Sequence, residues 1–278
     1  MLPNLIIIGA AKAGTTSLHY YLDLHPQIRM SQPKELNFFV EERNWTLGLD
    51  WYRSKFSGAE KIHGEASPAY TGAPAHPGVA ERMHGVVPDA RLIYVVRDPV
   101  SRMISHYVQR VAGWLEEGDI RDALVAPGAN PYIDGTRYAM QLKQYLEYYA
   151  VKQIMVITCE DLLANRAETL RSVFQFLEVD ETFRSLRFAR MRHRAIRKRK
   201  PGSFGLRLRK SILQSRLYTW SPDLAHYAEA IATLPFSRAV QVPELTEEVR
   251  RDVLDRLKDD LDEFKVITGR QFDAWRLT

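Results

Sequence analysis

The sequence predicts an α/β fold, a P-loop-like open parallel sheet flanked by helices on both faces, formed as a single domain over residues 1–278. Short, continuously apolar runs recur along the chain, and each is followed by a helical pattern. Such runs are typical of strands buried on both faces of a parallel sheet. The alternation of strand and helix favours an open, doubly wound arrangement.

The expected elements follow from this alternation. Apolar, β-branched runs predict strands at residues 5–8, 91–96 and 154–158, and a further short strand is expected at 62–65. Helical patterns cover residues 15–24, 99–111, 160–177 and 245–267, and a stripe over 138–149 indicates core packing. Asp98 is expected to cap the second helix, with Pro99 at its first position. Basic residues around Pro201 and Gly202 predict an exposed loop over 190–204.

The segment from Gly9 to Ser17 follows the first predicted strand and opens a helix. Its small residues let the backbone curl around a phosphate, and the N–H groups and positive end of the helix attract an anion. Lys12 adds a point charge and the hydroxyl groups add donors. A tight turn without a ligand is the alternative. The predicted anion-binding residues are Ala11, Lys12, Ala13, Gly14, Thr15, Thr16 and Ser17.

This loop differs from the Walker A motif at a position that decides between ligands. That motif reads G-x-x-x-x-G-K-[ST]. Gly9 and Gly14 have the right spacing, but Thr15 stands where the lysine belongs, and the loop's lysine is Lys12. The sequence therefore predicts an anion-binding loop without the nucleoside-triphosphate fingerprint. A P-loop kinase or nucleotidase acting with ATP and magnesium remains the alternative function.

A second anion site is predicted after the strand over residues 91–96. Arg97 ends this strand, and Ser105 lies eight residues later on the following helix, with Arg102 as a further cation between them. Open α/β sheets bind ligands at the carboxyl ends of their strands, which is where Arg97 is expected. The alternative for Arg97 is a structural pair with a carboxylate. Two anion sites at two strand ends fit a ligand with two separated phosphate groups.

These residues resemble the family of sulfotransferases that use 3′-phosphoadenosine 5′-phosphosulfate (PAPS). G-A-A-K-A-G-T-T-S-L (residues 9–18) is similar to the family's 5′-phosphosulfate-binding loop, and R-L-I-Y-V-V-R-D-P-V-S-R-M-I-S-H-Y (91–107) to its 3′-phosphate-binding strand and helix. K-E-L-N-F-F (34–39) and G-E-A-S-P-A-Y (64–70) resemble segments of the heparan-sulfate-type and bacterial branch. The resemblance spans nearly the whole chain.

The resemblance implies an activity and a role for several residues. It implies transfer of a sulfuryl group from PAPS to a hydroxyl or amine, with 3′-phosphoadenosine 5′-phosphate (PAP) as product and no metal. Lys12 would stabilise the leaving phosphate, and Glu35 of the K-E segment would be the catalytic base. The late basic stretch, through Arg199, Lys200 and Gly202, is expected near the 3′-phosphate or adenine, although a solvated loop fits it equally well.

Departures from the family pattern lie near the expected active site. Leu36 and Asn37 replace Pro and His of the K-E segment, and Ala66 replaces a lysine of the second segment. The predicted site therefore lacks one cation.

The reserve candidates for the base are His63, Glu65 and His106, and Cys159 is interpreted as a small buried hydrophobic residue.

Composition bounds the remaining expectations. The chain is 45% hydrophobic and 26% charged, which is typical of a globular protein, and its net charge of +5 suits an anionic ligand. Residues 184–216 are rich in Arg and Lys and contain no Asp or Glu, so a non-catalytic module for nucleic acid or lipid is a further alternative. The single cysteine of the chain and its start without a basic leader predict a cytoplasmic protein without a membrane span. The expected partner is a small-molecule, carbohydrate or carrier-bound acceptor and not nucleic acid; no oligomeric state is predicted.

Overall fold

The computed structural model describes the chain except for residues 190–198, 214–227, 229–231 and 278. Its contacts divide the chain into two compact units. The sheet unit comprises Met1–Met103, Arg121–His193 and Leu245–Thr278, and the smaller unit comprises Ile104–Ile120 and Arg194–Glu244. Each unit is described below by itself, and the assignment of residues 1–278 to a single domain stays a prediction.

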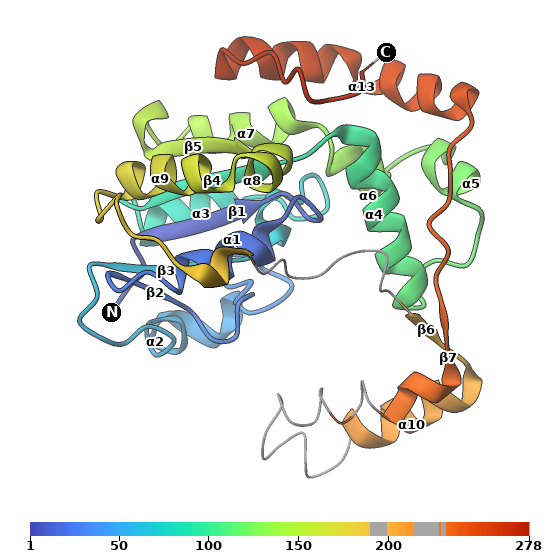
Figure 1. Cartoon of the computed structure of the whole chain (residues 1–278), viewed down its shortest axis with the longest axis horizontal. Helices are drawn as coiled ribbons and strands as arrows, with labels where there is room; N and C mark the ends of the chain where they lie inside the picture. Colours follow the sequence, from blue (N-terminus) through green and yellow to red (C-terminus); the bar gives the residue numbers. More distant parts are fainter. Residues whose placement is uncertain (190–198, 214–227, 229–231, 278) are drawn as a thin grey trace. The chain divides into compact units, whose positions relative to one another are not determined.

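A five-stranded parallel sheet forms the centre of the sheet unit. Its strands are β1 (Leu5–Gly9), β2 (Ile28–Met30), β3 (Ile62–Ala66), β4 (Arg91–Val96) and β5 (Ile154–Thr158). The spatial order is β2-β3-β1-β4-β5, which places β1 in the middle (Figure 1). The predicted α/β fold with an open parallel sheet is confirmed, and β2 is an additional edge strand.

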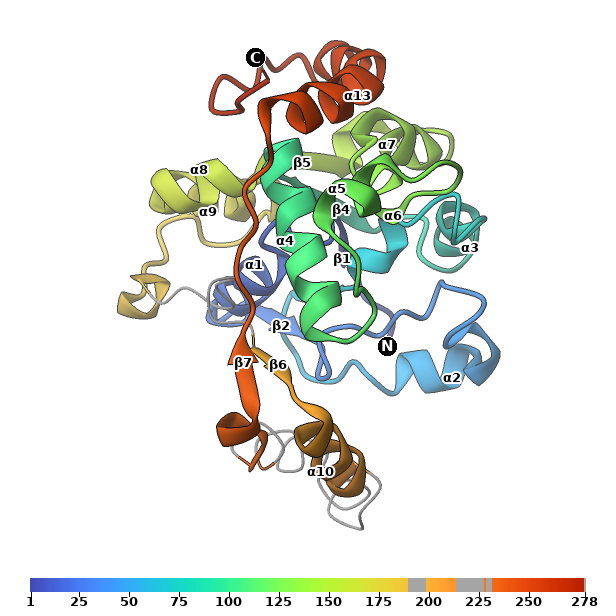
Figure 2. The ribbon, with the colours of Figure 1, turned by 90° about the vertical axis from the view of Figure 1, so that its right-hand side faces the viewer.

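Helices cover both faces of this sheet, as expected. Over both units, the α-helices of the described residues run over Thr15–Leu22 (α1), Gly48–Arg53 (α2), Val79–Val86 (α3), Pro99–Ala112 (α4), Ile120–Val125 (α5), Pro131–Asp134 (α6), Tyr138–Leu146 (α7), Cys159–Ala164 (α8), Arg166–Leu177 (α9), Ser203–Leu213 (α10) and Glu247–Thr268 (α13). In Figure 2, α1, α8 and α9 lie on one face of the sheet and α3 and α7 on the other. Strands β1, β3 and β4, at the centre of the sheet, are accordingly almost fully buried.

Side-chain caps mark the starts of α4 and α8. Asp98 Oδ1 accepts the backbone N–H of Ser101 at 2.8 Å, so the predicted cap of α4 is confirmed. The helix predicted over 160–177 is instead two helices, α8 and α9. Thr158 caps α8 by accepting the N–H of Asp161, and Asn165 (φ −119°, ψ 40°) leaves the helical conformation between the two helices.

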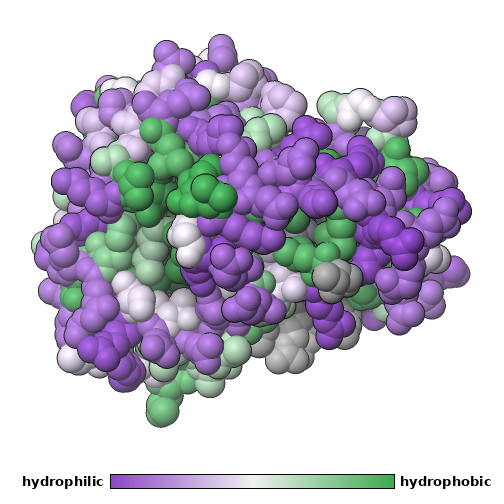
Figure 3. All heavy atoms as spheres, turned by 90° about the horizontal axis from the view of Figure 1, so that it is seen from above, coloured by the Kyte–Doolittle hydropathy of each residue, from purple (hydrophilic) through white to green (hydrophobic). Residues whose placement is uncertain are grey.

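Helix α13 closes the sheet unit by packing on α7. Asp260 accepts the N–H groups of Ala139 and Met140 in the first turn of α7, at 3.0 and 2.9 Å. Five apolar residues of α13 are buried at helical spacing: Val249, Val253, Leu257, Leu261 and Phe264. The face seen in Figure 3, on which α13 lies, is mostly hydrophilic. Within the part of the chain described, no helix is both long enough and apolar enough to cross a membrane.

The smaller unit corrects one prediction. The exposed loop expected over 190–204 is wrong where the structure describes it, because 199–201 form strand β6 (Arg199–Pro201) and α10 follows it. Strand β6 pairs antiparallel with β7 (Ser237–Ala239). Local composition could not show this partner, since it comes from a segment far away in the sequence. Residues 190–198 lie outside the described part.

Candidate functional site

The two predicted anion-binding segments start at neighbouring strand ends. The chain leaves β1 towards β2 and leaves β4 towards β5, so the carboxyl ends of β1 and β4 form the switch point where open α/β sheets bind ligands. The two strands pair directly, with Gly9 opposite Tyr94. Arg97 Nη1, just beyond β4, donates a hydrogen bond of 3.2 Å to the backbone oxygen of Lys12. The structure therefore brings Lys12 and Arg97 together.

The loop between β1 and α1 has the tight curvature that its small residues predict. Lys12 and Gly14 both have positive φ angles, 72° and 101°. The oxygen of Gly14 accepts the N–H groups of Ser17 and Leu18, which starts α1 directly after the loop. The helix N-terminus, with Thr15 in its first turn, then presents its positive end to this loop.

Arg102 anchors the loop through a hydrogen bond to its backbone. This side chain is fully buried, and Nη1 donates to the oxygen of Ala11 at 3.3 Å. Its other donors bind Thr136 Oγ1 at 2.7 Å and the oxygen of Tyr132 at 2.5 Å. Burial lowers the pKa of Arg102, yet a guanidinium stays protonated in proteins, so it holds positive charge beneath the loop. The sequence marks Arg102 only as a further cation; its contacts with distant backbone groups leave no local pattern.

The K-E segment lies at the same edge of the sheet as the end of β3. The oxygen of Lys34 accepts the N–H of Ala66 at 3.2 Å. Lys34 Nζ pairs with Glu35 Oε1 at 2.8 Å, and the Glu35 side chain is 49% exposed. His19 of α1 contacts the oxygen of Ser31 at 3.2 Å; burial first and the charge of Lys34 second lower the pKa of His19 to about 4. Because its side chain is half exposed, Glu35 can be reached from solvent, as a proton acceptor must be.

The reserve candidates for the base occupy less accessible places. Glu65 is fully buried and accepts hydrogen bonds from neighbouring hydroxyl groups, so it cannot reach an acceptor in solvent. His63 is buried on β3, and its Nε2 lies 3.8 Å from Glu60 Oε2. Cys159 is free and buried as interpreted, and burial raises the pKa of its thiol to about 11. A Cβ atom added at Gly14 would meet its Sγ at 3.4 Å.

The other predicted nucleotide contacts belong to the smaller unit. Ser105 is buried, two turns into α4. Arg199 donates from Nε to Ser237 Oγ at 2.8 Å, and Lys200 Nζ lies 4.0 Å from the centre of the Trp114 ring. The N–H of Gly202 binds the oxygen of Phe236 at 2.7 Å. Their contact with a nucleotide stays a prediction.

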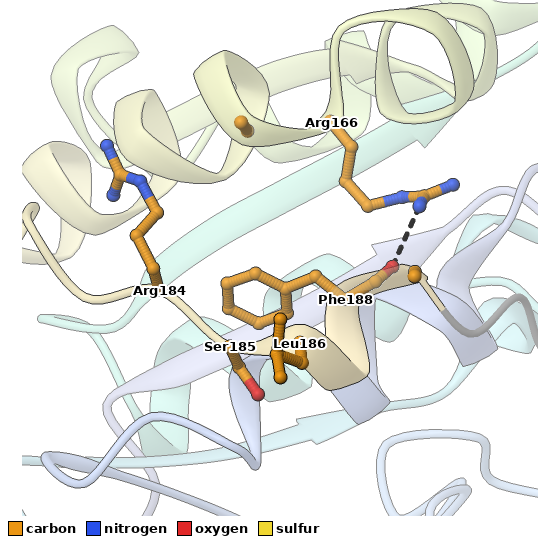
Figure 4. Close-up of a pocket in the computed structure, with 7 residues that line it drawn as sticks. Arg166, Arg184, Ser185, Leu186 and Phe188 are labelled. Atoms are coloured by element: carbon orange, nitrogen blue, oxygen red, sulfur yellow. Dashed lines mark hydrogen bonds between the residues drawn. The ribbon is translucent and has the colours of Figure 1, made fainter.

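An open pocket of about 420 Å³, which the sequence did not indicate, lies beside the start of α9 (Figure 4). It is lined by Arg166, Ala167, Arg184, Ser185, Leu186, Phe188 and Ala189. Arg166 Nη1 donates to the oxygen of Phe188 at 2.7 Å, and its guanidinium carbon lies 5.4 Å from the centre of the Tyr21 ring. Tyr21 also interacts with Ser17 of the anion-binding loop. One wall of the pocket is therefore connected through α1 to the loop.

Comparison with known proteins agrees with this geometry. Residues 2–220 match the model of the sulfotransferase domain. Heparan sulfate glucosamine 3-O-sulfotransferase 5 of Homo sapiens is 30% identical over 190 residues, covering 64% of this chain and 54% of that protein. The 3B1 enzyme of the same name from Mus musculus is 32% identical over 185 residues, covering 63% and 46%. The chain spans about half the length of these relatives.

A solved structure shows the same fold along the whole chain. The sulfotransferase from Alicyclobacillus acidocaldarius superimposes with a TM-score of 0.71 at 24% identity, covering 99% of each chain. At this identity the likeness concerns the fold alone. The match to the domain model covers the anion-binding loop, Arg97 and the K-E segment together. The chain therefore belongs to the sulfotransferase domain family.

Proposed function

We propose that this chain transfers a sulfuryl group from PAPS to a hydroxyl or amine of an acceptor and releases PAP. The observation that carries the proposal is the hydrogen bond from Arg97 to the backbone of Lys12. It joins a loop suited to a phosphosulfate with a cation suited to a second phosphate, at the switch point of the sheet. Membership of the sulfotransferase family supports the same nucleotide.

The residues of the loop supply electrostatic stabilisation in this mechanism. PAPS, when bound, supplies an activated sulfuryl group whose bond to a phosphate oxygen breaks as the acceptor bonds to sulfur. Lys12 and the N-terminus of α1 stabilise the negative charge that collects on the leaving phosphate. The buried charge of Arg102 adds to this field without occupying the site. Removal of one such stabilising group typically raises a barrier by about 2.7–4 kcal/mol.

Glu35 takes the proton of the acceptor in this proposal. Its carboxylate is half exposed and is held next to the ammonium group of Lys34 at 2.8 Å. The carboxylate is thereby held in one place beside a cation and open to solvent, where an acceptor can approach it. The lysine that the family pattern places beside it is Ala66 here, so Lys34 is the cation closest in sequence to the proposed base.

The acceptor is proposed only as a class. The relatives described above act, by their names, on glucosamine units of heparan sulfate. A glucosaminyl saccharide is therefore the first acceptor to test, followed by small hydroxylated molecules and carrier-bound acyl chains. Half-buried Trp45 and Trp51, close to Phe38 of the K-E segment, provide aromatic surface for such a molecule.

Transfer of labelled sulfate from PAPS to this panel tests the proposal. We expect label on at least one acceptor without added magnesium. We also expect PAP to raise the melting temperature, because a ligand that binds only the folded state stabilises it. Stabilisation by ATP with magnesium but not by PAP, together with phosphate transfer, would support a P-loop kinase instead.

A further inference from the structure

A buried carboxylate at the end of β3 organises the segment that carries the proposed base. Glu65 is fully buried, and three hydroxyl groups donate to it. Tyr52 and Tyr70 bind Oε1 at 2.7 and 2.8 Å, and Ser67 binds Oε2 at 2.6 Å. Ser67 and Tyr70 directly follow β3, while Tyr52 lies on α2.

Successive backbone N–H groups of the K-E segment point into this cluster. The N–H of Leu36 binds Glu65 itself. The N–H of Asn37 binds Ser67 Oγ at 2.9 Å, and the N–H of Phe38 binds the hydroxyl of Tyr70 at 2.9 Å. Three consecutive amides directly after Glu35 are thus held by one carboxylate and its partners.

Burial raises the pKa of Glu65, and the hydrogen bonds that it accepts oppose this rise because they favour the ionised form. Ser67 and Tyr70 each use their only hydroxyl hydrogen towards Glu65 and accept a backbone N–H on the oxygen. A protonated carboxyl or an amide at position 65 would place a second donor against groups whose hydrogens already point inwards. One donor would then be left without an acceptor in the core, which is costly. In this arrangement Glu65 serves as the common acceptor of the cluster.

We propose that Glu65 is a positioning residue that acts through Ser67 and Tyr70 to fix the backbone of residues 36–38 and so to aim Glu35 at the acceptor. A second link supports this, because Ala66, the residue after Glu65, donates to the oxygen of Lys34 at 3.2 Å. The backbone on both sides of Glu35, at Lys34 and at residues 36–38, is thereby hydrogen-bonded to the end of β3 and the residues that follow it. The inference rests on the proposed function, in which Glu35 is the base.

Two tyrosines provide a matched test, since both donate to the same oxygen of Glu65 and both are buried. Only Tyr70 also accepts an N–H of the K-E segment. Tyr52 stacks on Phe38 at 4.2 Å, and phenylalanine keeps that ring. Tyr70→Phe and Tyr52→Phe therefore remove the same group from Glu65, but only the first frees the segment.

The experiment compares the two variants in the full-length chain by hydrogen exchange and by steady-state kinetics. In Tyr70→Phe we expect exchange at residues 36–38 to become about tenfold faster, the loss of one hydrogen bond. We expect kcat to fall about ten- to a hundredfold with the KM for PAPS unchanged, because misplacing a catalytic group costs turnover. Tyr52→Phe should lower the melting temperature about as much as Tyr70→Phe does, but it should keep kcat within about threefold of the wild-type value.

The outcomes separate this inference from the proposed function. Equal kcat in both variants, or unchanged exchange at residues 36–38 in Tyr70→Phe, overturns the positioning role. If Tyr70→Phe fails to fold, Ser67→Ala removes the acceptor of the Asn37 N–H and is tested against the same control. If the wild-type chain transfers no sulfate at all, the proposed function fails, and the exchange measurement alone still decides whether the cluster holds the segment.

Discussion

Gly14→Ala tests whether the anion-binding loop needs its left-handed residue. Gly14 has φ 101° and ψ 9°, a conformation that costs a residue with a side chain about 1–2 kcal/mol. The added Cβ would meet Cys159 Sγ at 3.4 Å, which is ordinary contact, so sterics add little. If the loop keeps its shape, a loss of this size lowers the melting temperature by about 2–8 °C. If the loop relaxes, the same energy weakens PAP binding by about 5- to 30-fold.

Differential scanning fluorimetry measures the loss of melting temperature, and isothermal titration calorimetry with PAP measures the loss of affinity in the same variant. Gly85→Ala is the matched control, because Gly85 lies within α3 and nothing lies within 4 Å of its added Cβ. Alanine favours a helix, so this control should melt at the same temperature or slightly higher and bind PAP normally. A Gly14→Ala chain that loses neither stability nor PAP affinity would refute the reasoning about the loop.

Two further predictions concern the proposed base and the acid stability of the fold. Glu35→Gln should lower kcat by at least about a hundredfold and change the Kd for PAP by less than about twofold, as checked by labelled-sulfate transfer and calorimetry; full turnover would place the base elsewhere. His19 has its pKa lowered from 6.5 to about 4, so the unfolded state gains the proton first as the pH falls below 6.5. The fold thereby loses about 2 kcal/mol between pH 7 and pH 5, a loss that levels off below pH 4. Melting curves of His19→Gln should lose less stability over that interval than wild type; equal slopes would contradict the assignment.

The sequence predicted those parts of the fold whose pattern is local. Strands β1, β4 and β5 are continuous apolar runs, so each could be recognised from its own residues. Strand β2 has three residues and an exposed Arg29 at its centre, which leaves no run to recognise. The break between α8 and α9 depends on the conformation of Asn165, which the helical periodicity does not reveal.

The residues of the candidate site also divide into those that a local sequence pattern predicts and those that only the fold reveals. Lys12 and Arg97 were predicted to meet because parallel strands end at one edge of a sheet, and the structure brings them together. Arg102 and Glu65 contact segments distant in the sequence, so their roles emerge only from the fold. Glu65 was a reserve candidate for the base, and the hydroxyl groups that enclose it give it a different role.

Binding of PAP and of an analogue without the 3′-phosphate to the Arg97→Ala chain tests most directly whether one nucleotide bridges the two anion sites. A guanidinium that contacts a phosphate contributes about 1.5–3 kcal/mol, so PAP should bind about ten- to a hundredfold more weakly. The analogue should lose less than about threefold under the same conditions. Equal losses for both ligands would contradict the assignment of Arg97 to the second phosphate.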